Sequence, residues 1–179
     1  MRAMNIQSRF KSQVKQEEYF KVLIKQSKVL NGEMEFLAGV RTFTHATQVE
    51  EDLNMDEVYD ALDSFGAASK IAFAESDIEL EARCESWIGK IYHKALKKDA
   101  KAMSHFNSVL RLANSLRPRD VTQEEWYKFS KETLDAVREK RRLEEEAAQD
   151  RADKPFRDMV LADITNVKEE AKKGCKAFL

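Results

Sequence analysis

Glycine and proline are scarce in this chain, which has five glycines and two prolines among its 179 residues. In an average protein these two residue types together make up about 12% of the chain. A β-sandwich or β-barrel needs a turn about every 8–12 residues, and so few turn-forming residues do not supply them. The scarcity therefore predicts an all-α protein, built from helices with short connections.

Charged residues are abundant but balanced. They make up 35% of the chain with a formal net charge of -1, so we expect them on solvated helix faces. Hydrophobic residues reach 42%, which allows a folded core. The sequence has no apolar run long enough to span a membrane and no apolar signal near its start, and Cys84 and Cys175 do not suggest a disulfide framework. We therefore expect a cytoplasmic protein that does not enter a membrane.

Helix start and stop signals divide the chain into about seven helices. Asn31-Gly32 predicts the end of the first helix, because both residues tolerate the left-handed cap conformation. Four later helices are expected to begin at capping residues. These are Asn54 with Glu57, Ser76 with Glu79, Asp99, and Thr122 with Glu125.

The two prolines mark the remaining boundaries. Pro118 predicts a break, since the residue before a proline is pushed out of the helical region. Asp153 and Pro155 resemble a cap and a first-turn proline, and they predict a seventh helix. We expect a single domain with three segments: an N-terminal helix (1–32), a helical array (33–150), and a C-terminal helix that packs on or extends the array (151–179).

A pattern of small and aromatic residues recurs at an offset of 41 residues. Ala61-x-x-x-Phe65-x-x-Ala68 corresponds to Ala102-x-x-x-Phe106-x-x-Val109. Between them lies Ile88-Gly89-x-x-Tyr92, and Gly89 is 41 residues before Ser130 in the segment that follows Trp126. A small residue lets two helices approach, and an aromatic ring fills the space beside it. The repeat core is therefore expected at Ala61, Phe65, Ala68, Ile88, Gly89, Tyr92, Ala102, Phe106, Val109 and Trp126.

This pattern resembles the tetratricopeptide repeat. The resemblance implies antiparallel helix pairs stacked in a right-handed array, most clearly over 55–135. The period of 41 differs from the family's period of about 34 residues. The alternative is a generic helical bundle in which the small and aromatic pairs are ordinary packing.

The resemblance also implies a concave binding groove, lined by the first helix of each pair. One helical stripe contains three basic residues of this groove, Arg83, Lys90 and Lys94. This stripe predicts an acidic peptide or a C-terminal carboxylate as ligand. The Asn with which some relatives clamp chaperone tails is replaced by Trp87, so that clamp is not predicted. The predicted groove residues are Arg83, Ser86, Lys90, His93, Lys94, Tyr127 and Lys131, with His45 and Val49 from the second helix.

No catalytic, metal-binding or cofactor-binding motif stands out, and we expect a non-catalytic scaffold that binds proteins. One alternative is a structural module that associates with its own copies. A less favoured alternative is nucleic-acid binding through the basic run 138–142, because acidic residues follow that run at i+4.

The chain ends in a short apolar sequence, 175–179, which suggests a piece of a longer protein. Helical arrays followed by a charged helix are similar to those that precede a J domain in some co-chaperones. The resemblance implies a chaperone-related partner, although the His-Pro-Asp motif of a J domain does not occur in this sequence.

Overall fold

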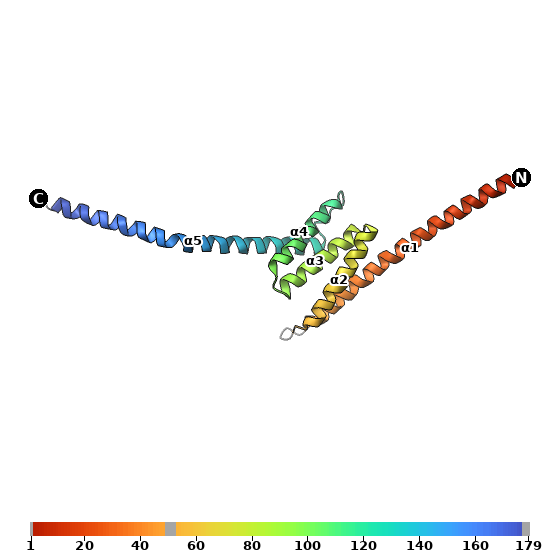
Figure 1. Ribbon diagram of the computed structural model, residues 1–179, viewed down its shortest axis with the longest axis horizontal. Helices are drawn as coiled ribbons and strands as arrows, with labels where there is room; N and C mark the ends of the chain where they lie inside the picture. The colour runs from red at the N-terminus through yellow and green to blue at the C-terminus, as the bar shows by residue number, and fades with distance from the viewer. Residues whose placement is uncertain (1, 49–52, 177–179) are drawn as a thin grey trace. The chain divides into compact units, whose positions relative to one another are not determined.

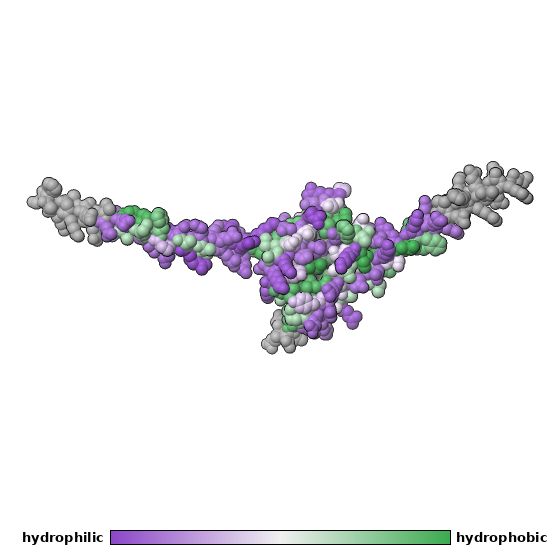
Figure 2. Space-filling view, in the orientation of Figure 1, coloured by the Kyte–Doolittle hydropathy of each residue, from purple (hydrophilic) through white to green (hydrophobic). Residues whose placement is uncertain are grey.

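A computed structural model describes the backbone of residues 2–48 and 53–176 and the side chains of 15–48, 53–166 and 168. Over these residues the chain is all-α, as predicted (Figure 1). The chain divides into two compact units, Met1–Leu134 and Asp135–Leu179. Hydrophilic side chains cover much of the visible surface (Figure 2). The helices are α1 (Arg2–Ala46), α2 (Met55–Glu75), α3 (Ile78–Lys94), α4 (Asp99–Ser115) and α5 (Glu125–Lys176).

Adjacent helices of the first unit pack antiparallel, with α1 against α2, α2 against α3, and α3 against α4. The first ten residues of α5 belong to the same unit. There are five helices in the described residues rather than the predicted seven. The two differences lie at Asn31-Gly32 and at Pro155.

The predicted end of the first helix at Asn31-Gly32 is wrong, because α1 continues through both residues. A Cβ atom at Gly32 would lie 3.1 Å from side-chain atoms of both Ile71 and Leu80. The absence of a side chain at Gly32 therefore allows α2 and α3 to pack close to α1, and the glycine does not supply a left-handed cap. Gly39 lies against the ring of Phe65 in the same way.

The predicted seventh helix is also wrong, because Pro155 lies inside α5. The carboxylate of Asp153 accepts hydrogen bonds from Gln149 and does not cap a new helix. A proline removes one backbone donor from the helix. Beside this position Arg157 donates to the carbonyl and the carboxylate of Asp150, at 3.3 and 2.9 Å.

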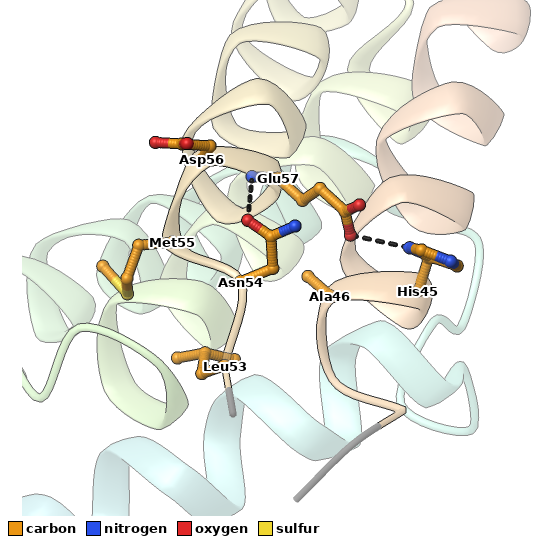
Figure 3. Close-up of a pocket in the computed structure, with 7 residues that line it drawn as sticks. All are labelled: His45, Ala46, Leu53, Asn54, Met55, Asp56 and Glu57. Carbon is orange, nitrogen blue, oxygen red and sulfur yellow. Dashed lines mark hydrogen bonds and ion pairs between the residues drawn. The ribbon is translucent and has the colours of Figure 1, made fainter. Parts of the chain in front are cut away.

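The capping prediction for α2 is confirmed. The side chain of Asn54 accepts from the backbone N–H of Glu57 at 3.4 Å, next to a contact between Glu57 and His45 (Figure 3). The prediction for α3 is one residue early. Asp77 accepts from the N–H of Leu80 at 3.1 Å, and Ser76, at φ 58°, instead caps the C-terminus of α2.

Two other helix starts are shifted. The cap of α4 is Lys98, and Asp99 begins the helix with its carboxylate 2.8 Å from Nδ1 of His93. α5 begins at Glu125, and the backbone and hydroxyl of Thr122 donate to Asp120 within the preceding turn. The break near Pro118 is confirmed, because α4 ends at Ser115.

The residues predicted for the repeat core lie in the interior of the first unit. Six are fully buried, Ile88 and Gly89 are buried, and Tyr92 and Trp126 are half-buried. Two clusters form, one around Phe65 and one around Phe106. The six fully buried residues are Ala61, Phe65, Ala68, Ala102, Phe106 and Val109.

α3 and α4 pack closely at Gly89. A Cβ atom at this position would lie 2.5 Å from Cε1 and 2.8 Å from Cδ1 of Phe106. The ring of Phe106 is fully buried and contacts Phe129 of α5 edge-on, so it has little room to move. Gly89 therefore lets Phe106 fill the space between three helices.

We predict opposite effects for alanine at two glycines. An alanine in a helix is favoured over glycine by about 1 kcal/mol, so Gly66→Ala should stabilise the protein, since nothing lies within 4 Å of its Cβ position. Gly89→Ala should destabilise it, and Gly89→Leu should do so by about 1–3 kcal/mol. Urea denaturation measures all three. Equal gains for the two alanine variants would contradict the close contact.

Candidate functional site

A groove runs along one side of α3 in the first unit. Two adjoining hollows of about 510 and 340 Å³ form it, and they share Trp87 and Lys90. We call them together the α3 groove. The first is lined by Phe36, Leu37, Val40, Arg83, Ser86, Trp87, Lys90, Glu125, Trp126 and Phe129, and the second adds Phe43, Thr44, Thr47, Leu53, Lys94 and Ala95.

Hydrogen bonds of two buried serines join α3 to α5 beside the groove. Ser86, which is 4% exposed, donates to the backbone carbonyl of Trp126 at 3.1 Å. Ser130, which is fully buried, lies 2.9 Å from the Ser86 hydroxyl. Buried polar groups cost free energy unless they are paired, so this contact requires both helices to be in place.

Aromatic rings form the wall of the groove. Trp87 stacks on Phe65 with centroids 5.7 Å apart and meets Phe43 edge-on at 6.2 Å. The Lys90 ammonium lies 4.1 Å from the Trp87 ring centroid and 5.4 Å from that of Phe129. Lys94 lies 5.5 Å from the Phe129 ring. Cations are attracted to the faces of aromatic rings, so these contacts hold two positive charges over an apolar surface.

The two lysines differ from the other basic residue of the groove. The Arg83 guanidinium is 2.8 Å from a carboxylate oxygen of Glu33 and lies over the ring of Phe36. Within the described part of the chain, neither Lys90 nor Lys94 forms an ion pair. Burial lowers the pKa of Lys90, the neighbouring charge of Lys94 lowers it further, and Glu125 opposes the shift.

The structure brings together four of the seven predicted groove residues: Arg83, Ser86, Lys90 and Lys94. The other three lie outside the lining. His93 contacts Asp99 at 2.8 Å, Tyr127 packs edge-on against Trp126, and Lys131 is exposed on α5.

The two residues expected from the second helix do not extend the groove. His45 lies 2.8 Å from a carboxylate oxygen of Glu57 and lines a different hollow, at the start of α2 (Figure 3). Val49 lies outside the described residues.

Sequence reasoning missed the aromatic part of the groove. The sequence patterns assign Trp126 to the repeat core, and Trp87 to the start of the Ile88-Gly89-x-x-Tyr92 segment and to the position of the missing asparagine. The signal that could have found Trp87 is its spacing of three residues from Lys90, which places both on one helix face. The indole N–H of Trp126 is buried and has no acceptor in the described part of the chain.

The basic run 138–142 in the second unit is neutralised along its own helix, as its sequence predicts. Arg141 lies 3.5 Å from Glu145, and Lys140 lies 4.0 Å from Glu144. Arg142 contacts both Glu139 and Glu146. The charges of this segment are therefore largely satisfied locally.

None of the described helices has the length and apolar character needed to cross a membrane. Comparisons with protein-family models, curated proteins and solved structures gave no match. The resemblance to tetratricopeptide repeats therefore rests on the residues named above.

We predict that the Lys90 ammonium loses its proton below the ordinary lysine pKa of 10.5, because burial and Lys94 disfavour its charge. A pH titration of the lysine side-chain NMR signals, with Lys90→Arg to assign the Lys90 signal, measures this. Lys94→Gln should raise the Lys90 pKa, since it removes a like charge. A Lys90 pKa that does not respond to Lys94→Gln would contradict the proximity of the two ammonium groups.

Proposed function

We propose that this chain is a non-catalytic interaction scaffold that binds an acidic segment of a partner protein in the α3 groove. The observation that carries the proposal is the pair of ammonium groups of Lys90 and Lys94, held over aromatic rings without an ion pair in the described residues. A carboxylate between them would form charge-assisted hydrogen bonds, which are about twice as strong as neutral ones.

The remaining lining favours a peptide with an apolar side chain beside its acidic group. Phe36, Leu37 and Val40 give the larger hollow an apolar wall.

The hydroxyl groups of the lining support binding rather than catalysis. Thr44 donates to the carbonyl of Val40 at 2.7 Å, and Thr47 donates to that of Phe43 at 3.0 Å. Ser86 donates to the carbonyl of Trp126. Each hydroxyl is thus engaged with backbone, whereas a nucleophile needs a neighbouring base.

We also propose that the first unit is a divergent tetratricopeptide-like array, and that it serves as the adaptor part of a co-chaperone. Two features support the array. The Ala61/Phe65/Ala68 and Ala102/Phe106/Val109 sets are buried at the same offset, and the groove is lined by α1, α3 and α5. In the resembled family the first helix of each pair lines the groove.

Charge reversal tests the groove. Lys90→Glu with Lys94→Glu should abolish binding of a synthetic acidic peptide, because attraction becomes repulsion, and raising the salt should weaken the wild-type affinity. Calorimetry with the acid and amide forms of the peptide distinguishes a C-terminal carboxylate from acidic side chains. Circular dichroism and urea denaturation of the double variant check that the fold is retained, because Lys90 is half-buried against the Trp87 ring.

The matched control is Lys21→Glu with Lys25→Glu. These lysines have the same i,i+4 spacing, lie exposed on α1 and do not line the α3 groove. The control changes the net charge by the same amount and should retain binding. An equal loss of peptide affinity in both double variants would mean that net charge alone explains the loss. That result would contradict a specific groove.

A further inference from the structure

The side of α1 that faces away from the core is apolar. α1 packs on the first unit through buried residues at 32, 36, 39, 43 and 46. Eight large hydrophobic side chains of α1 are 40–63% exposed, and five of them are spaced along the side opposite these buried residues. Green side chains on α1 are visible in Figure 2. The five spaced residues are Phe20, Leu23, Leu30, Met34 and Leu37, and we call this set the α1 stripe.

The α1 stripe has the spacing of a coiled-coil seam. Its members, with Ser27, follow steps of three and four residues from 20 to 37. This places them at the a and d positions of a heptad, where apolar residues insert between those of a facing helix. A regular apolar seam on a solvent-exposed helix face is unusual, because large exposed apolar patches mark interaction sites.

The α1 stripe also contains no charged residue. Between residues 16 and 38 there are seven charged residues, and a 3.6-residue period places all of them off this face. Two of them contact the rest of the first unit instead, Lys28 with Glu75 and Glu33 with Arg83. The seven are Glu17, Glu18, Lys21, Lys25, Lys28, Glu33 and Glu35. A copy of the same face would therefore meet no like charge along this segment.

We propose that the α1 stripe packs antiparallel against the α1 stripe of a second copy of this chain. In one antiparallel register Phe20 faces Leu37 of the second copy, and Leu23 faces its Met34. The two-fold symmetry of a dimer makes each contact twice. Leu37 belongs both to the α1 stripe and to the lining of the α3 groove, so the dimer would cover one edge of the groove. Leu30 does not line the groove, so a change at Leu30 tests the dimer separately from peptide binding.

Charge complementarity selects this orientation. Arg41 is exposed at the next a position of the seam and has no ion pair in the described residues. In the antiparallel register it lies beside Glu17 of the second copy, which flanks the seam. A parallel register would place the two Arg41 side chains against each other. The stripe and its end charges thus fit a second copy in one direction.

Sedimentation of the full chain over a range of concentrations tests the dimer. We expect a reversible monomer–dimer equilibrium, and Leu30→Glu should raise the dissociation constant by about tenfold or more, because it places carboxylates in the seam. Leu143→Glu, at a leucine that is 51% exposed in the second unit, is the matched control and should have no effect. A monomer at all concentrations up to millimolar, or a dimer unaffected by Leu30→Glu, would overturn the proposal.

Cross-linking tests the orientation. In a Cys175→Ser background, where the remaining native Cys84 is buried, Leu23→Cys and Met34→Cys are prepared as separate proteins. The antiparallel register predicts that oxidation links the mixture of the two, and that neither protein alone forms a disulfide dimer. A disulfide dimer of the Leu23→Cys protein alone would show a parallel pairing and overturn the register.

Discussion

The contact between Gly89 and the Phe106 ring governs how α3, α4 and the start of α5 meet. With no side chain at Gly89, Phe106 lies between α3 and α4, where a Cβ atom would be 2.5 Å from it. The same ring meets Phe129 edge-on at 5.9 Å, which places the start of α5 against α4. In that position the Ser86 hydroxyl reaches the carbonyl of Trp126. The α3 groove is therefore a consequence of tight packing beneath it.

The environment of Lys90 differs from that of two arginines that are paired on the surface. Arg119 contacts Glu79 and Glu124, and Arg142 contacts Glu139 and Glu146, so these cations are satisfied within the chain. Lys90 is instead partly removed from water next to Lys94, and burial lowers its pKa. A cation kept in an unfavourable environment is typical of a functional site, and this contrast supports a ligand with negative charge.

Much of the fold could be predicted from local patterns, because burial follows periodicity. The Ala61 and Ala102 motifs and the Asn54 cap are examples. The errors occur where a tertiary contact determines the role of a residue. Gly32 has the sequence signal of a helix end, but it lies inside α1 because Ile71 and Leu80 pack against it. For the groove, the helical stripe identified Lys90 and Lys94. It did not place Tyr127 and Lys131 correctly relative to the lining, because each residue turns a helix by about 100° and the orientation of α5 depends on its packing.

The two tryptophans of the chain allow a direct test of whether the α3 groove is the binding face. Trp87 and Trp126 both line it and come from different helices. The measurement is a titration of ¹⁵N-labelled protein with an acidic peptide, following both indole N–H signals by NMR. If the groove binds the peptide, both signals shift with the same affinity, and neither shifts when Lys90 and Lys94 are replaced by glutamate. Saturating binding with both indole signals unchanged would contradict it.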